Sequence, residues 1–288
     1  MEKDIFDQVF FDGIQKTTSL SILDDKINDV VESINVNGYC RLKGLITDQQ
    51  ISSAKEYLFN SKLTAKQRST SSKEDFLLDI SYDPRIIRIA TRFFNEEAAP
   101  IQGLLFKYPS EQAIHQDTVH FSTMPRDKMM AYWVALEDVS FDQGPLTYIA
   151  NTHLLPTFTK YEMPLGGSTS LGNNKNIRED YEKYTEELSL AIKRLKLETF
   201  TFEAKAGDAF VWHPRLWHGG GEVINKDKTR YSYVTHYMAK DTPVYIKHFR
   251  GLTYLPRFEN PRDLATDKPL YKFGILSLLV RFLKLIRS

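Results

Sequence analysis

The sequence predicts an α+β fold in which helices come first and an antiparallel sandwich or jelly roll follows. Three observations support this prediction. Before Pro100, apolar side chains recur at helical spacing; after it, apolar and aromatic runs of strand length follow one another; and one long charged amphipathic segment, 177–197, interrupts these runs. Short strands separated by turns favour an antiparallel architecture over a parallel α/β sheet, in which helices would alternate with strands.

The bulk composition describes a globular chain with a substantial core. The chain has 288 residues, of which 42% are hydrophobic, so extensive disorder is excluded. Lys plus Arg number 38 against 37 for Asp plus Glu, a formal net charge of +1, which argues against nucleic acid as a partner. Cys40 is the single cysteine, so no intrachain disulfide and no multi-cysteine zinc site can form.

The first hundred residues show periodic apolar positions and clear helix boundaries. Residues 20–37 place Ile and Val at helical spacing until Gly38, after which a short strand follows at 39–42. Thr47 is a good N-cap, and Asp83 followed by proline opens another helix. Helices are therefore expected at 20–37, 47–60 and 83–94.

The second half of the chain carries the strands of the expected sandwich. Apolar runs bounded by Gly, Pro and Asp predict strands at 101–107, 129–136, 199–203, 208–212 and 231–238. The charged amphipathic segment at 177–197 is expected to be a helix within an insertion at about 157–198. In the absence of repeats or long linkers, we expect one domain over 1–269, with its barrel core at about 100–245.

The last segment, 270–288, is a predicted amphipathic basic helix. Three basic residues are spaced through a wide apolar arc, which makes a bilayer-spanning role unfavourable. Two alternatives stay open: the helix docks on its own domain or a partner subunit, or it lies on an anionic membrane surface. The mixed, polar start of the chain shows no secretory signal. We expect a cytoplasmic protein, and the second alternative would place it peripherally at the inner face of a membrane.

A candidate metal site comes from two segments about a hundred residues apart. His115 and Asp117 form an HxD pair, and in an extended chain residues i and i+2 lie on the same face. His218 follows a predicted strand and precedes three glycines. Two imidazoles and one carboxylate on one face of a metal are the ligand set of non-haem Fe(II) oxygenases, which leaves three positions open.

A candidate anion site follows the last ligand by twelve residues. Arg230 and Ser232 share a face if this segment is extended, and a guanidinium with a hydroxyl suits a carboxylate. Gln102 and Lys107, on the strand before the HxD pair, are secondary candidates for the same pocket. An HxD pair alone is weak evidence, since it also arises as a surface hydrogen-bonded pair. The other histidines are assigned no metal: His120, His153, His213, His236 and His248.

The segments 115–156 and 207–238 together resemble the phytanoyl-CoA dioxygenase family. The shared features are the HxD pair, a strand ending in WVALEDV, a QGPL turn, a Gly-Asp pair before the distal histidine, and an R-x-S; the resemblance covers roughly 35–240. It implies a double-stranded β-helix (a cupin-like jelly roll), bound Fe(II), 2-oxoglutarate as co-substrate, and Arg230 and Ser232 on its far carboxylate. Related halogenases lack the carboxylate that Asp117 supplies here, so hydroxylation is favoured.

The expected function is therefore that of a 2-oxoglutarate-dependent dioxygenase, in which His115, Asp117 and His218 are the catalytic metal ligands. The substrate is expected to be a small molecule, lipid- or sugar-linked, and the sequence does not define it further. Two alternatives stay open: a cupin-like metal enzyme that does not use 2-oxoglutarate, and a non-catalytic binding module on the same barrel.

Overall fold

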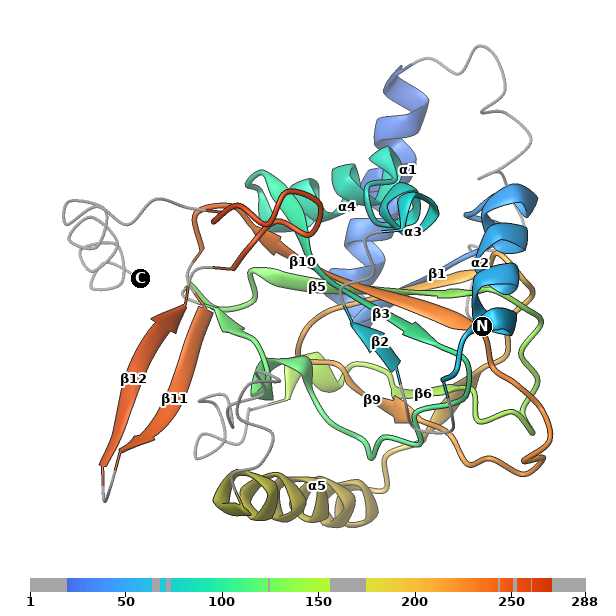
Figure 1. Ribbon diagram of the computed structural model, residues 1–288. Coiled ribbons are helices and arrows are strands. Elements are labelled where there is room, and N and C mark those ends of the chain that lie inside the picture. The colour runs from blue at the N-terminus through green and yellow to red at the C-terminus, as the bar shows by residue number, and fades with distance from the viewer. Residues whose placement is uncertain are drawn as a thin grey trace.

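The computed structural model describes residues 20–63, 68–70, 74–123, 125–155, 175–242, 244–250, 253–259 and 261–270. Its centre is a six-stranded sheet in which every neighbouring pair is antiparallel (Figure 1). In spatial order the strands are β1 (Tyr39–Leu42), β8 (Ala209–Trp212), β5 (Met129–Ala135), β10 (Ser232–Ala239), β3 (Ala98–Phe106) and β2 (Arg68–Thr70).

Two smaller sheets complete the β-structure, and one of them faces the large sheet. This sheet runs in the order β7 (Phe200–Phe202), β6 (Leu146–Ile149), β9 (Trp217–Gly220). The other joins β4 (Ser122–Thr123) to the hairpin of β11 (Val244–Arg250) and β12 (Thr253–Glu259), which projects from the body of the molecule (Figure 1). The predicted antiparallel sandwich is confirmed at this level.

Strand alternation divides the interior into two cores. In β8, Phe210 and Trp212 point into the space between the two sheets, whereas Ala209 and Val211 point to the helices. Both faces of the central strands are thus buried, which explains why β5 and β8 have continuous apolar sequences rather than alternating ones. The core between the sheets forms the wall on which the site is built.

Four helices cover the outer face of the large sheet (Figure 1). They are α1 (Leu20–Asn37), α2 (Asp48–Asn60), α3 (Asp75–Ser81) and α4 (Pro84–Phe94). Thr47 caps α2 in a reciprocal capping box with Gln50, and Asp83 accepts from the Arg85 N–H at the start of α4. The helices expected at 20–37, 47–60 and 83–94 are confirmed.

The helix of the insertion, α5 (Lys175–Leu195), lies alongside the smaller sheet, on the side away from α1–α4 (Figure 1). Tyr184 and Leu188 are fully buried against Val119, Ile149 and Trp217. The expected helix at 177–197 is confirmed over most of its length. Residues 157–174 of the expected insertion lie outside the described residues.

Several elements were not anticipated, for physical reasons that differ. The short strand β9 has the sequence WHGG, which has little strand propensity and becomes a strand only through its pairing with β6. The strand expected at 39–42 is confirmed as β1. Both β1 and the unexpected β2 come from before residue 100 yet join the large sheet, so the sheet extends beyond the expected 100–245 core. Residues 271–288 of the predicted terminal helix lie outside the described residues. Among those described, no helix combines the length and apolarity needed to cross a bilayer.

Candidate active site

The two histidines of the predicted triad lie directly opposite each other across an antiparallel bridge. His115 N donates to His218 O at 2.8 Å, and His218 N donates to His115 O at 3.0 Å. This reciprocal pair of bonds puts both side chains on the same face, with ring centroids 4.5 Å apart. A Cβ on Gly219 would lie 2.7 Å from Gln112 O, so the glycine after His218 allows this close approach.

Hydrogen bonds to backbone carbonyls define the tautomer of each imidazole. His115 Nδ1 donates to Ala113 O at 2.9 Å, and His218 Nδ1 donates to Leu216 O at 3.0 Å. Since a carbonyl oxygen can only accept, Nδ1 carries the proton in both rings and each Nε2 presents a lone pair. Both rings are therefore prepared to bind a cation through Nε2.

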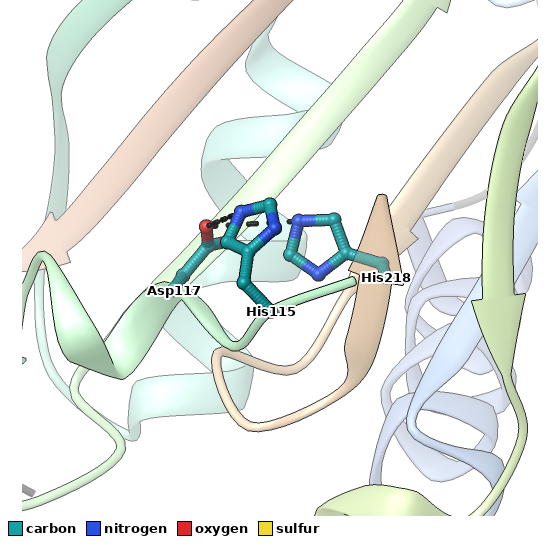
Figure 2. A group of neighbouring side chains, drawn as sticks. All are labelled: His115, Asp117 and His218. Carbon is teal, nitrogen blue, oxygen red and sulfur yellow. Dashed lines mark ion pairs between the residues drawn. The ribbon is translucent and has the colours of Figure 1, made fainter. Parts of the chain in front are cut away.

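Asp117 brings a carboxylate to these two nitrogens. Its Oδ1 lies 3.7 Å from His115 Nε2 and 3.6 Å from His218 Nε2 (Figure 2). The ligand atoms of the three residues all lie within 4.8 Å of one another, and all three side chains are buried. Asp117 starts the 3₁₀ turn Asp117–Val119, directly after the extended residue Gln116. The predicted ligand set is thus assembled on one face.

The electrostatic setting favours metal binding over protonation. Burial lowers the pKa of His218 to about 4, and the hydrogen bond to Leu216 O opposes this shift only in part. The ring is therefore neutral at pH 7, as a metal ligand must be. A divalent cation would neutralise the buried carboxylate of Asp117, whose Oδ1 faces Nε2 of both histidines.

The triad opens into a cavity of about 250 Å³ between the two sheets. One side of this cavity is apolar, with Phe106, Trp133 and Leu146 in its wall. Arg230 lies at this side, 4% exposed, with its guanidinium 6.0 Å from the Phe106 ring and 5.9 Å from the Trp133 ring. Its Nη1 donates to Gly144 O at 3.0 Å, whereas its buried Nε has no hydrogen-bond partner among the described residues.

The guanidinium of Arg230 therefore brings a positive charge into the cavity, and no carboxylate of the described residues forms an ion pair with it. Burial lowers its pKa to about 10, which the charge of Glu137 opposes, so the group is still cationic at pH 7. Ser232 is fully buried on β10, and its Oγ also lacks a partner in the described part of the chain. Ser232 does not line the cavity, however, so its predicted contact with a co-substrate stays a prediction.

The secondary candidates separate into two groups. Gln102 and His236 are partners across β3 and β10 and both line the cavity. Lys107 points elsewhere and donates to Phe59 O and Ser61 O, at 3.4 and 3.3 Å. His153 and His213 pack on each other with ring centroids 5.1 Å apart, outside the group of metal ligands.

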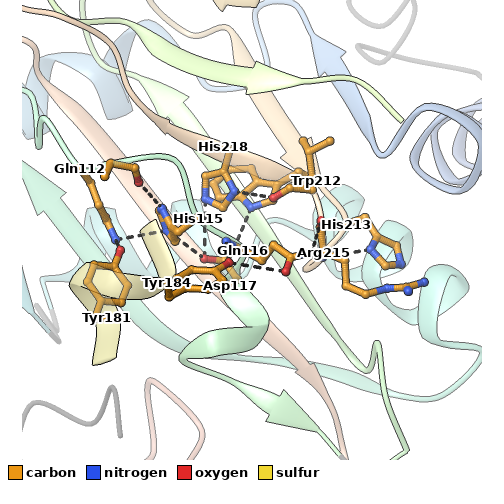
Figure 3. A network of polar contacts seen from close by, with 12 residues as sticks. Gln112, His115, Gln116, Asp117, Tyr181, Tyr184, Trp212, His213, Arg215 and His218 are labelled. Atoms are coloured by element: carbon orange, nitrogen blue, oxygen red, sulfur yellow. Dashed lines mark hydrogen bonds and ion pairs between the residues drawn. The ribbon is translucent and has the colours of Figure 1, made fainter. Parts of the chain in front are cut away.

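Sequence reasoning missed the residues on the open side of the triad. Gln112 Nε2 lies 3.2 Å from His115 Nε2 and donates to Tyr181 Oη at 3.1 Å (Figure 3). The ring of His120 packs against the Tyr181 ring. Tyr181 comes from α5, so no local signal connects it to the HxD pair. It was also not anticipated that Trp212 Nε1 donates to Asp117 Oδ2 at 2.8 Å. Alternation from Phe210 in a predicted strand was the available signal for Trp212.

Solved structures of similar fold hold iron or 2-oxoglutarate. The epimerase SnoN, in complex with Fe3+, alpha ketoglutarate and nogalamycin RO, matches with a TM-score of 0.57 at 17% identity, covering 88% of this chain and 97% of that one. EctD from S. alaskensis, with 2-oxoglutarate and 5-hydroxyectoine, matches with a TM-score of 0.53 at 17% identity, covering 85% and 83%. At this identity the similarity concerns the fold, which is the cupin-like jelly roll implied by the family resemblance.

Sequence comparison gives the family. The human peroxisomal phytanoyl-CoA dioxygenase is 28% identical over 143 residues, covering 48% of this chain and 36% of the relative. A probable phytanoyl-CoA dioxygenase of Caenorhabditis elegans is 25% identical over 205 residues, covering 70% and 58%. The chain thus spans between about a third and three fifths of the length of these relatives. The model of the phytanoyl-CoA dioxygenase (PhyH) family matches residues 41–231, and the chain belongs to this family.

Proposed function

We propose that the protein is an Fe(II)- and 2-oxoglutarate-dependent dioxygenase that hydroxylates a small-molecule substrate. One observation carries this proposal: the cavity that contains the three metal-ligating groups also contains a buried guanidinium with an unpartnered Nε. A buried cation is stabilised when an anion neutralises it, and the planar guanidinium matches a carboxylate. An iron(II) ion bound here would let dioxygen oxidise the substrate C–H bond to C–OH, with 2-oxoglutarate supplying the other two electrons as it is converted to succinate and CO2.

The protein residues then have distinct roles. His115, Asp117 and His218 would hold the metal, a ligand set that would leave coordination positions for the co-substrate. Arg230 binds the far carboxylate of 2-oxoglutarate. Ser232, two residues further along the chain, does not line the cavity; its buried Oγ has no partner among the described residues and is proposed as a second donor to that carboxylate once the co-substrate is bound. The apolar wall excludes water, which strengthens the interaction between guanidinium and carboxylate. Because Asp117 occupies the carboxylate position, the proposal is hydroxylation rather than halogenation.

The substrate approaches from the side opposite the apolar wall. There Gln112, His120 and Tyr181 present polar, hydrogen-bonding groups to the cavity. Among the described residues that line the cavity, Arg230 is the single Lys or Arg, and its guanidinium is paired with the co-substrate carboxylate. No basic side chain of this lining is then left to bind an anionic group of the substrate. Such a wall suits a hydroxyl-bearing part of a molecule, as a sugar-linked substrate or a polar lipid would provide.

Anaerobic titration tests the cofactor chemistry directly. Metal-free protein receives Fe(II) and then 2-oxoglutarate, while the visible charge-transfer band of the chelated co-substrate is recorded. We expect a band in the wild type, no band in His218→Ala, and a band in Arg230→Met that needs far more 2-oxoglutarate. His213→Gln removes a buried histidine outside the triad and should keep the band.

The same titration separates the alternatives. A wild-type protein that binds Fe(II) but shows no response to 2-oxoglutarate would be a cupin-like metal enzyme of another kind. A folded protein that binds no metal in any variant would be a binding module. Either result would contradict the proposed function.

A separate proposal concerns 270–288, for which the sequence indicates an amphipathic basic helix. The segment would serve either peripheral membrane contact or self-association. Flotation with anionic liposomes, comparing the full chain with residues 1–269, tests the membrane contact. Equal flotation of the two proteins would remove the segment from any membrane role.

A further inference from the structure

The side chain of Trp212 contacts two of the three metal ligands. Its Nε1 donates to Asp117 Oδ2 at 2.8 Å, and its ring packs against the His218 ring at 4.8 Å between centroids (Figure 3). The residue is 2% exposed and Asp117 is 3% exposed, so water does not compete for this bond. An indole N–H can only donate, so the direction of the bond is unambiguous.

Trp212 lies in a central strand, whereas Asp117 lies in a short turn. It ends the central strand β8 and is paired with Tyr39 on one side and Ala131 on the other. Asp117, in contrast, starts a single 3₁₀ turn in the connection between β3 and β4. Its Oδ2 accepts no other hydrogen bond from the described residues. The orientation of this carboxylate therefore depends on a side chain of the main sheet.

We propose that Trp212 is the positioning residue of the metal site: its indole N–H holds Asp117 Oδ2 so that Oδ1 alone faces the two imidazoles. Outer partners of this kind orient ligating carboxylates, and their loss weakens metal affinity about 10- to 100-fold. Phenylalanine would fill much of the same space but could not donate. This inference rests on the proposed function, because it presumes that the triad binds a metal.

Titration with Co(II) tests the role without turnover. Trp212→Phe is compared with Trp133→Phe, which removes an indole from the same cavity whose Nε1 has no hydrogen-bond partner among the described residues. We expect the Co(II) dissociation constant to rise about tenfold in Trp212→Phe. In Trp133→Phe it should stay within about threefold of the wild-type value. The visible d–d spectrum of Co(II) bound to Trp212→Phe should change as well, because the released Oδ2 can enter the coordination sphere.

Other outcomes overturn the inference. If Trp212→Phe binds Co(II) within threefold of wild type, or if both variants lose affinity equally, the indole does not position the carboxylate. If Trp212→Phe keeps its Co(II) affinity while the wild-type protein shows the charge-transfer band with Fe(II) and 2-oxoglutarate, the proposed function stands and only the role of Trp212 is wrong. A wild-type protein that binds no Co(II) through His218 would overturn both.

A second measurement uses the unmodified chain, in case Trp212→Phe does not fold. The sequence has 3 Trp, so the indole region of a ¹H–¹⁵N spectrum contains three signals, which the Trp133→Phe and Trp217→Phe variants assign by elimination. Zn(II), a diamagnetic probe, should shift the Trp212 indole signal more than the other two. A Trp212 signal that does not move when Zn(II) binds would contradict the inference.

Discussion

The guanidinium of Arg230 lies in an interior where no described carboxylate forms an ion pair with it. A second arginine, the half-buried Arg85, provides the contrast, because its Nε and Nη2 both donate to Asp83, at 2.9 and 2.6 Å. The paired arginine stabilises the fold by neutralising a buried charge, whereas the unpaired one destabilises the metal-free protein. The difference indicates that Arg230 is present for a ligand.

Replacement of the two arginines should therefore have opposite effects on stability. Without metal or co-substrate, Arg230→Met should leave the free energy of unfolding unchanged or raise it, by up to about 3 kcal/mol, since a pKa lowered to about 10 reflects unfavourable burial of the charge. Arg85→Met should lower it by about 3 kcal/mol, because Asp83 loses its partner. Denaturant unfolding at pH 7 measures both. A clear loss of stability in Arg230→Met would contradict the assignment.

His213 gives a prediction for pH. Burial first, then the charges of His153 and Arg215, lower the pKa of His213 to about 3. Below its ordinary pKa of 6.5, the unfolded chain binds a proton that the folded protein does not, so stability falls as pH falls from about 6.5 towards 3. The loss from this residue should reach roughly 2 kcal/mol by pH 5.

Unfolding of the metal-free protein at pH 7 and pH 5 tests this linkage. His213→Gln should lose about 2 kcal/mol less than wild type between these two values. A smaller slope will remain in the variant, because the pKa of His218 is lowered too. The same loss in both proteins would show that His213 does not carry the effect.

At the scale of elements, the insert helix α5 is attached to the metal-binding segment on both sides of His115. Tyr181 accepts from Gln112 Nε2 at 3.1 Å, and Tyr184 accepts from Gln116 N at 2.9 Å. Tyr184 is fully buried, so its hydroxyl satisfies a main-chain donor that water does not reach. The helix thus supports the loop that carries two of the three ligands.

Two matched substitutions on this helix should distinguish a tyrosine that supports the ligand-bearing loop from one that only lines the cavity. Tyr184→Phe leaves the buried N–H of Gln116 unsatisfied and should lower the free energy of unfolding by about 1–3 kcal/mol. Tyr181→Phe removes a hydroxyl at the cavity and should lower it by less than about 1 kcal/mol. Denaturant unfolding of the two variants gives the comparison. Equal losses would mean that α5 does not support the loop through Tyr184.

At the scale of the whole molecule, the triad joins segments from separate parts of the fold. His115 and Asp117 follow β3, whereas His218 lies on β9 in the smaller sheet. A metal that bridges them can bind the folded state far better than the unfolded chain, so binding and stability are linked.

Metal should therefore stabilise the whole domain. Co(II) at about a hundred times its dissociation constant should raise the free energy of unfolding by about 2.7 kcal/mol. His218→Ala should show little of this gain, since one of the three ligands is absent. Thermal unfolding with and without Co(II) measures the effect. An equal gain in the variant would place the stabilising metal elsewhere on the protein.

Local patterns anticipated much of the architecture and the ligands. Thr47 and Asp83 mark helix starts, and apolar runs mark β3, β5, β8 and β10, because caps and strand alternation depend on neighbouring residues. The HxD pair and the distal histidine were visible for a related reason. A metal ligand set requires particular residue types, which a sequence displays directly.

Contacts between distant segments were not visible in this way. Nothing near Asp117 in the chain indicates that Trp212 holds its carboxylate, and nothing near Gln112 indicates Tyr181. Ser232 alternates along β10 with Val234 and His236, which line the cavity, but its own buried Oγ has no partner among the described residues, so its contact with a co-substrate stays a prediction.

The sequence by itself determined the class of fold, the family motifs and the residues able to bind a metal, because each depends on residue type and local spacing. Only the tertiary structure decided which groups meet in the cavity: the unpartnered guanidinium, the indole on Asp117 and the tyrosines of α5. These contacts join residues up to 95 positions apart, such as Asp117 and Trp212. Their formation follows from the packing of sheets and helix around one core, which no local pattern encodes.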